Sequence, residues 1–166
     1  MKKIICILAC ISFALWAALR IGNGVDFEQK CGGYLKLAGD ANTIELAERY
    51  LAIAVKHCED QDLTKGYTSV FYKTPDENIA FWYINLKASL DDLRSTPADA
   101  PQLVVSNVLM KLRETLLDGG DGKASVTCPD GISIYPNNKA FFAWGLISLI
   151  VAIIAGIGLW RDSDYW

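Results

Sequence analysis

Two long apolar segments lie near the ends of the chain. Residues 4–19 are apolar apart from Ser12 and two cysteines, and residues 140–160 contain no charged side chain. A helix of about 20 residues is long enough to cross the hydrocarbon core of a bilayer. Trp144 and Trp160 flank much of the second segment, as aromatic residues do at membrane interfaces. We therefore predict transmembrane helices over residues 1–21 and 140–160.

The first apolar segment also fits a cleaved signal peptide. Gly22-Asn23-Gly24 supplies small residues for cleavage, whereas the length of the apolar segment and the charge of Arg20 favour an uncleaved signal anchor. A lipoprotein signal at Cys10 is less consistent with the sequence, because Leu8 is bulky where a small residue is expected. We favour the uncleaved anchor and keep cleavage as the alternative.

Small residues recur at every fourth position in both apolar segments. In lipid, such stripes allow helix backbones to approach closely. We predict that they face each other or a partner helix, and the alternative is that Ala and Gly are simply common in membrane spans. The predicted packing residues are Cys10, Ala14 and Ala18 in the first segment and Ser148, Ala152 and Gly156 in the second.

Positive charge sets the expected orientation. Lys2 and Lys3 precede the first span and favour a cytoplasmic N-terminus. The second span then returns the chain, so that residues 161–166 form a short cytoplasmic tail and residues 22–139 lie across the membrane. The Met-Lys-Lys start suggests a bacterium. We therefore predict an inner-membrane protein with a periplasmic domain and the lipid bilayer as its first partner.

Between the spans, apolar residues recur at the spacing of four amphipathic helices. We predict helices over residues 26–39, after Asn42, after Thr74-Pro75, and from Thr96-Pro97 to Gly119-Gly120. An even number of passes returns the chain to the bilayer, which favours an up-down-up-down four-helix bundle over residues 22–122. The clearest apolar stripes are Ile44, Ala47, Leu51, Ala54 and Cys58 in the second helix and Ile79, Trp82, Leu86, Leu90 and Leu93 in the third.

A β-prone pattern follows the predicted bundle. Residues 124–127 and 132–135 flank the turn sequence Cys128-Pro129-Asp130-Gly131. We predict a hairpin and connector over residues 123–139, close to the bilayer. The expected fold class is thus an all-α membrane protein, with two terminal transmembrane helices, a four-helix extracytoplasmic bundle and a small membrane-proximal β-hairpin.

Three cysteines lie outside the predicted spans, in a compartment that favours disulfides if it is oxidising. Three thiols permit one bridge and one spare thiol. We predict a disulfide between Cys58 and Cys128, because both are expected at the membrane-proximal end, whereas Cys31 lies further out. The alternative is three separate buried cysteines.

Charge and motif content argue against several function classes. Residues 20–139 carry 13 Lys and Arg against 17 Asp and Glu, which does not favour nucleic acid as a partner. His57 is the only histidine, and its neighbour Cys58 points about 100° away on a helix, so the two do not form a catalytic dyad. The loop at Asp118 to Gly122 lacks the alternating acidic ligands of a calcium loop. We predict no catalytic residue, metal site or cofactor.

Aromatic residues mark the most informative candidate surface. Tyr67, Phe71 and Tyr72 lie in the loop before the third helix, which is long for a connection within a bundle. Aromatic residues dominate the centres of protein interfaces, which favours a docking surface for a membrane partner. The alternative is that these side chains lie in the lipid headgroup zone.

These patterns favour a non-enzymatic integral membrane protein. We predict a scaffold or accessory subunit of a membrane complex that binds other membrane proteins or associates with itself. A ligand-sensing ectodomain that signals through a separate partner is the alternative, since only residues 161–166 follow the second span. An enzyme with an unrecognised site is a third possibility.

Overall fold

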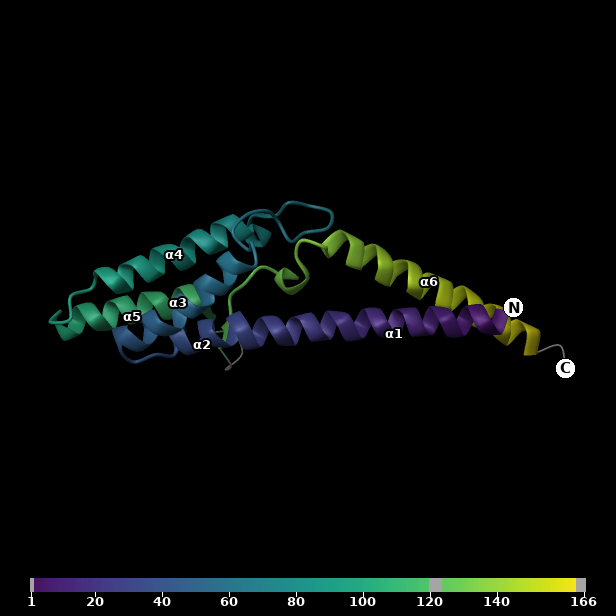
Figure 1. Ribbon diagram of the computed structural model, residues 1–166, viewed down its shortest axis with the longest axis horizontal. Coiled ribbons are helices and arrows are strands. Elements are labelled where there is room, and N and C mark those ends of the chain that lie inside the picture. The colour runs from purple at the N-terminus through teal and green to yellow at the C-terminus, as the bar shows by residue number, and fades with distance from the viewer. Residues whose placement is uncertain (1, 120–123, 164–166) are drawn as a thin grey trace.

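The computed structural model describes residues 2–119 and 124–163 and is mostly helical. A long first helix comprises α1 (Lys2–Phe27), the π-helical segment η1 (Glu28–Gly32) and α2 (Gly33–Gly39). It is followed by α3 (Ile44–Asp60), α4 (Ile79–Ser95), α5 (Gln102–Leu116) and α6 (Asn138–Ser163). In Figure 1, α1 and α6 extend together from one end of a domain that contains α2 to α5. Parts of the predicted helix end at Gly119-Gly120 and of the predicted tail lie outside the described residues.

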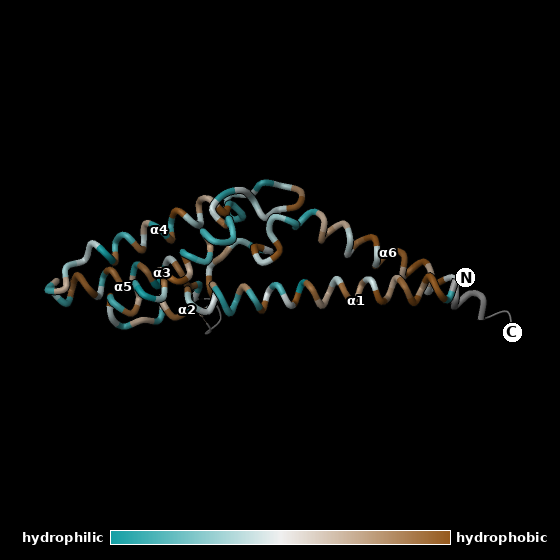
Figure 2. Tube along the Cα trace, viewed as in Figure 1, coloured by the Kyte–Doolittle hydropathy of each residue, from teal (hydrophilic) through white to brown (hydrophobic). Residues whose placement is uncertain are grey.

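Two helices are long and apolar enough to span a membrane. These are the continuous helix Lys3–Gly39 and the helix Asn138–Gly158. Only 6% and 11% of the residues in their most apolar windows are buried, whereas the core helix of a soluble protein would be mostly buried. Figure 2 shows the apolar residues of α1 and α6 concentrated away from the helical domain. The two spans predicted from the sequence therefore correspond to candidate membrane spans.

The first helix does not end where the sequence predicts. Residues 1–21 and 26–39 were expected to form separate helices, but α1 continues through residues 22–27 and joins η1 and α2 without a break. An ion pair between Lys30 Nζ and Asp26 Oδ1, 2.6 Å long, links successive turns at this junction. The widened π-helical turn ends at Gly32, the first residue of the pair Gly32-Gly33. The candidate span is thus a direct continuation of a domain helix.

The domain core is formed by α2, α3, α4 and α5, together with Cys31 of η1 and residues 63, 117 and 132. The stripe predicted for α4 is confirmed, because all five of its positions are buried. The stripe of α3 is confirmed except at Ile44, which is half-buried. The fully buried side chains with the largest volumes are Leu35, Leu51, Ile79, Leu86, Leu93, Leu116, Cys31 and Cys58.

Helix starts differ from the predicted caps. Thr43, rather than Asn42, caps α3 by accepting a hydrogen bond from the Leu46 backbone N–H. Thr74 begins only a short 3₁₀ turn, η2 (Pro75–Glu77), and Asn78 caps α4 by accepting from the Phe81 N–H. Pro101 lies at the start of α5, five residues beyond Thr96. Several Thr and Asn residues offer equivalent capping groups, so sequence alone does not select among them.

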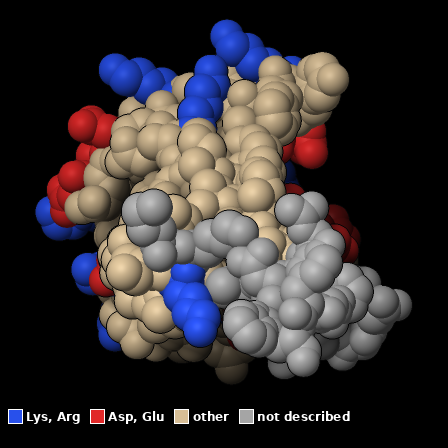
Figure 3. Space-filling model, turned by 90° about the vertical axis from the view of Figure 1, so that its right-hand side faces the viewer, with Lys and Arg blue, Asp and Glu red and all other residues tan. Residues whose placement is uncertain are grey.

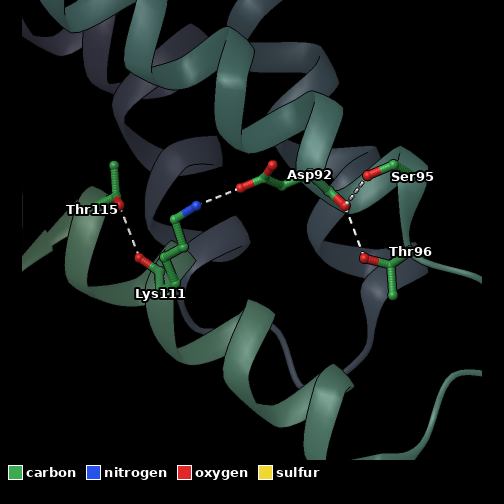
Figure 4. Close-up of polar contacts among 5 residues, drawn as sticks. All are labelled: Asp92, Ser95, Thr96, Lys111 and Thr115. Atoms are coloured by element: carbon green, nitrogen blue, oxygen red, sulfur yellow. Dashed lines mark hydrogen bonds and ion pairs between the residues drawn. The ribbon is translucent and has the colours of Figure 1, made fainter.

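In the connection from α4 to α5, Thr96 binds the end of α4 and does not cap α5. Its hydroxyl donates to the Asp92 carbonyl over 2.8 Å and the Ser95 hydroxyl donates to the same carbonyl, so both satisfy the end of α4 (Figure 4). The Asp92 carboxylate accepts from Lys111 Nζ over 2.6 Å, which joins α4 to α5. Thr96 therefore ends one helix instead of starting the next.

The small sheet has a different composition from the predicted hairpin. Strand β2 (Ser125–Val126) pairs antiparallel with β1 (Leu117–Asp118), not with residues 132–135. Residues Ile132–Ile134 form a 3₁₀ turn, η4, closed by successive short-range backbone hydrogen bonds. These local bonds leave no extended strand to pair, and Ile132 and Ile134 are buried instead. Gly39 makes room for β1, because a Cβ there would lie 2.8 Å from the Leu117 side chain.

Candidate functional site

The loop of residues 61–78, here called the aromatic loop, is anchored at both ends. Leu63 is buried in the core, and the Ile79 N–H donates to the Gly66 carbonyl over 3.0 Å. Tyr67 and Asn78 form an isolated antiparallel bridge, and the Thr68 N–H donates to the Glu77 carbonyl. The ends of the loop are therefore fixed, and residues 69–76 project as one unit.

Phe71 and Tyr72 are the exposed tip of this unit. Their side chains are 73% and 79% exposed. The Phe71 ring contacts the ring of Phe142 edge to face, with centroids 5.0 Å apart. Phe142 lies in the first turns of α6, so the tip is held where the second candidate span begins (Figure 1). The structure thus places two exposed aromatic side chains next to the entry point of a candidate span.

Tyr67 has a different environment from the other two predicted residues. Its hydroxyl accepts a hydrogen bond from Asn78 Nδ2 over 3.2 Å, and Lys73 Nζ lies 5.5 Å from its ring centre. Its side chain is 36% exposed. Tyr67 therefore supports the aromatic loop, whereas Phe71 and Tyr72 present its surface.

Sequence analysis missed the residues that tie this loop to α6. The Tyr135 hydroxyl donates to the Lys65 carbonyl over 2.9 Å. Asn138 Nδ2 donates to the Gly131 carbonyl over 2.8 Å, which fixes the turn before α6. The sequence pattern predicts this segment only as part of the hairpin and connector over residues 123–139. The polar groups of Tyr135 and Asn138, just before an apolar span, are the signal that could have indicated these contacts.

The helices α1 and α6 pack through polar and small groups. Trp16 Nε1 donates to the Phe141 carbonyl over 2.8 Å, and Trp144 Nε1 donates to Ser12 Oγ over 2.9 Å. A Cβ at Gly145 would lie 2.6 Å from the Trp16 ring, so glycine permits this close approach. Seen from the end at which α1 begins and α6 ends, side chains that are neither basic nor acidic make up most of the described surface in view (Figure 3).

The predicted small-residue stripes divide into two groups. Ser148 is buried, and Ala152 and Gly156 are half-buried. By contrast, Cys10, Ala14 and Ala18 are exposed, so the prediction that the two stripes face each other is wrong for α1. The face of α1 that contacts α6 instead contains Ala9, Ser12 and Trp16. Successive residues of a helix point about 100° apart, so this face differs from that of the Cys10 stripe. Contact of the Cys10 stripe with a partner helix stays a prediction.

A cleft of about 320 Å³ lies between α4 and the segment after β2. Phe81, Trp82 and Asn85 line one side, and Cys128 and Asp130 line the other. Trp82 Nε1 donates to the Thr127 carbonyl over 2.9 Å and holds the two sides together. Its mainly apolar walls suit a small apolar group better than a charged one.

His57 and the cysteines have separate surroundings. His57 packs edge to face against Phe27, and burial, followed by the nearby charge of Lys30, lowers the pKa of its imidazole. Cys58 is fully buried with its Sγ 3.7 Å from Cys31 Sγ, so it faces away from His57 as helical spacing predicts. Burial raises the pKa of the Cys128 thiol to about 11. Within residues 2–119 and 124–163, no three His, Cys, Asp or Glu side chains gather as a metal site requires.

Comparison with known proteins finds no match to this chain among family models, curated proteins or solved structures.

Proposed function

We propose that this chain is a non-enzymatic integral membrane protein that acts as a scaffold or accessory subunit of a membrane complex. The aromatic loop docks a neighbouring membrane protein beside α6. The exposed aromatic tip of Phe71 and Tyr72, held against Phe142 at the start of a candidate span, is the observation that carries the proposal. Exposed aromatic residues at this level meet a partner that diffuses in the same bilayer.

In this proposal, α1 and α6 form a hairpin in the bacterial inner membrane, with both termini cytoplasmic and residues 22–139 periplasmic. The two indole hydrogen bonds between α1 and α6 support an uncleaved first span. Cleavage would remove both Ser12, which accepts from Trp144, and Trp16, which donates to the Phe141 carbonyl. The start at Lys2 and Lys3 supports the orientation.

We interpret α2 to α5 as an up-down-up-down four-helix bundle. Contacts of α2 with α3, α3 with α4, α4 with α5, and α2 with α5 support this interpretation, because they close a ring of neighbours. The aromatic loop connects the second and third helices of that ring, so it lies at the membrane-facing end. The distal connections then point away from the bilayer, where they leave the docking surface free.

The docking role is tested by replacing the tip and retaining the loop. A Phe71→Ser, Tyr72→Ser double variant keeps Tyr67 and its bond to Asn78, so the loop should stay folded. Lys73 is exposed beside the tip and can be replaced by a photoreactive amino acid. With no other change in the chain, this group should crosslink a membrane partner in intact cells. The double variant should lose this crosslink.

A matched control variant separates docking from general surface polarity. Leu103→Ser with Met110→Ser removes two apolar side chains that are 73% and 55% exposed. Both belong to α5, a helix that lies away from α6 (Figure 1). This variant should retain the crosslink. A crosslink that survives replacement of Phe71 and Tyr72 would exclude the docking role.

One observation favours ligand sensing as a second candidate function. The cleft beside Trp82 is lined by α4 and by the chain that leads to η4, and η4 contacts α1. A ligand in this cleft would press on a segment that reaches the first candidate span. Isothermal titration with a panel of small apolar and aromatic compounds tests this candidate, and Trp82→Ala should abolish any binding that is found.

A further inference from the structure

Two of the three cysteines outside the apolar segments 4–19 and 140–160 are in contact. Cys31 lies in the π-helical segment η1, and Cys58 lies near the end of α3. Both side chains are fully buried, and their sulfur atoms are 3.7 Å apart. Cys128 is half-buried and lines the clefts on either side of its segment. The observed sulfur neighbour of Cys58 is therefore Cys31, whereas the sequence predicts Cys128.

We propose that Cys31 and Cys58 form a disulfide bond in the mature protein, with Cys128 remaining a thiol. The disulfide joins η1, the segment directly after α1, to α3. This inference rests on the proposed placement of the domain outside the cytoplasm, where thiol oxidation is sustained. The partner it implies is a thiol–disulfide oxidoreductase or another disulfide donor of that compartment.

The bond forms by two exchange steps. One cysteine, as a thiolate, attacks the donor disulfide, which forms a mixed disulfide and releases one donor sulfur as a thiolate. The second cysteine then attacks the mixed disulfide at the first cysteine's sulfur, which closes the Cys31–Cys58 bond and releases the other donor sulfur. Two protein thiols are oxidised, one donor disulfide is reduced to two thiols, and the two protons of the protein thiols pass to the donor.

Because both cysteines are buried in the folded domain, the exchange must take place before folding is complete. In the folded domain the neighbouring Cys58 sulfur, followed by burial, raises the pKa of the Cys31 thiol, so little thiolate is present for attack. Neither sulfur is accessible to a donor once α3 packs on η1. The exchange therefore occurs while the chain folds, and the packed core then shields the bond from reduction.

The bond links two residues that are 27 positions apart, and one of them lies in η1, directly after the end of α1 at Phe27. Because η1 continues directly into α1, the cross-link fixes the angle at which the first span enters the domain.

Peptide mapping tests the pairing directly. The full chain is isolated from its native membrane in mild detergent with an alkylating reagent present from lysis, and is digested with trypsin without reduction. Cleavage after Lys and Arg puts the three cysteines on separate peptides, residues 31–36, 57–65 and 124–139. The expected product is peptide 31–36 linked to 57–65, with an alkylated Cys128. A link between 57–65 and 124–139, or three alkylated thiols, overturns the inference if the domain is outside the cytoplasm.

Placement is measured separately, by protease digestion of spheroplasts and of inverted vesicles. If the protease reaches the domain from the periplasmic side and Cys31 is alkylated, the disulfide is rejected and the proposed placement stands. If the domain is cytoplasmic, the placement fails, and the full chain is instead reduced, unfolded and refolded into detergent with oxidised glutathione. Peptide 31–36 linked to 57–65 then supports the pairing, and its absence overturns it.

A stability measurement provides an independent readout. Dithiothreitol, added during refolding, should lower the thermal unfolding midpoint of the natural chain by several degrees and leave that of Cys58→Ala unchanged. Cys128→Ser is the matched control, and it should respond to dithiothreitol as the natural chain does. An equal response of the natural chain and Cys58→Ala would contradict the disulfide.

Discussion

The paired helices α1 and α6 and the helical domain arrange their apolar and polar groups in opposite ways. In the domain, Leu35, Leu51 and Leu86 are buried, and ion pairs such as Arg94 with Glu48 lie outside. In the helix pair, large apolar side chains point outward, and the contact between the helices contains indole N–H groups, hydroxyl groups and a glycine. Water drives the burial of apolar groups, whereas a lipid environment leaves packing and hydrogen bonds to hold helices together.

This difference implies that a large-to-small substitution in the core should destabilise the domain. In the helix pair, a small-to-large substitution at the contact should weaken the association of α1 with α6. The two regions also share one kind of contact, an indole N–H donated to a partner far along the chain. The variants below separate these contributions, and each can be measured on the full chain in mild detergent.

Leu51→Ala should have the largest effect. Leu51 is fully buried on α3, so truncation removes apolar contacts and leaves a cavity. The free energy of unfolding of the domain should fall by about 3 kcal/mol. Leu103→Ala, at a position that is 73% exposed, is the matched control and should change it by less than about 0.5 kcal/mol. Denaturant titration followed by circular dichroism measures both, and equal effects would show that the assigned core is wrong.

Gly145→Leu should have the next largest effect, confined to the helix pair. A Cβ at Gly145 would already lie 2.6 Å from the Trp16 ring, so the larger side chain must separate α1 from α6. Overpacking of this kind costs about 2 kcal/mol. The indole N–H resonances of Trp16 and Trp144 should shift and exchange faster with solvent, whereas that of Trp82 should not change. Gly158→Leu is the control, because nothing lies within 4 Å of a Cβ there.

The features of the fold that the sequence predicts well depend only on the spacing of apolar residues within one segment. The three-four repeat of Ile79, Trp82 and Leu86 is sufficient to assign the buried face of α4, and the lengths of the apolar segments are sufficient to mark the candidate spans. Neither assignment needs knowledge of a distant partner.

Long-range choices were not predictable from such patterns. The face that α1 turns toward α6 is fixed by Trp16 and Trp144, whose hydrogen-bond partners are 125 and 132 residues away. The small residues of the Cys10 stripe carry no information about that choice. Likewise, β2 could be recognised as a strand, but its partner is Leu117–Asp118, at the end of a helical pattern. The aromatic tip could be identified from composition, and its contact with Phe142 could not.

Trp16→Phe and Trp82→Phe compare the same change in the two regions. Each substitution retains an aromatic ring and removes an indole N–H that donates to a backbone carbonyl. The loss should be about 1 kcal/mol for Trp82 in the domain. It should be about 0.6 kcal/mol for Trp16, because other groups in lipid also satisfy polar partners when helices separate.

Thermal unfolding in detergent measures the Trp82 effect, and exchange of the Trp144 indole N–H reports on the helix pair in Trp16→Phe. A much larger effect at Trp16 than at Trp82 would mean that hydrogen bonds, rather than close packing at Gly145, dominate the association of α1 with α6.

The smallest effect is expected at the exposed contact of Tyr83 with Glu59. The Tyr83 hydroxyl donates to Glu59 Oε1 over 2.6 Å, and this bond, aided by Lys87, lowers the pKa of the carboxyl below its ordinary 4.5. Burial and the same bond raise the pKa of Tyr83 to about 12. The carboxylate therefore stabilises the fold above pH 4.5 and loses this contribution as the pH falls through its lowered pKa. The tyrosine contribution is lost as the pH rises from 10 to about 12.

Tyr83→Phe should consequently lower the thermal unfolding midpoint slightly at neutral pH, and this effect should fade as the pH falls through the lowered pKa of the Glu59 carboxyl. A double-mutant cycle with Glu59→Gln isolates the contact, and its coupling should disappear in acid. A coupling that persists once the Glu59 carboxyl is fully protonated would assign the effect to packing of the Tyr83 ring against α3 instead of to the charged hydrogen bond. That result would make this surface contact resemble the apolar core of the domain, and it would weaken the contrast between a polar exterior in the domain and a polar interior in the helix pair.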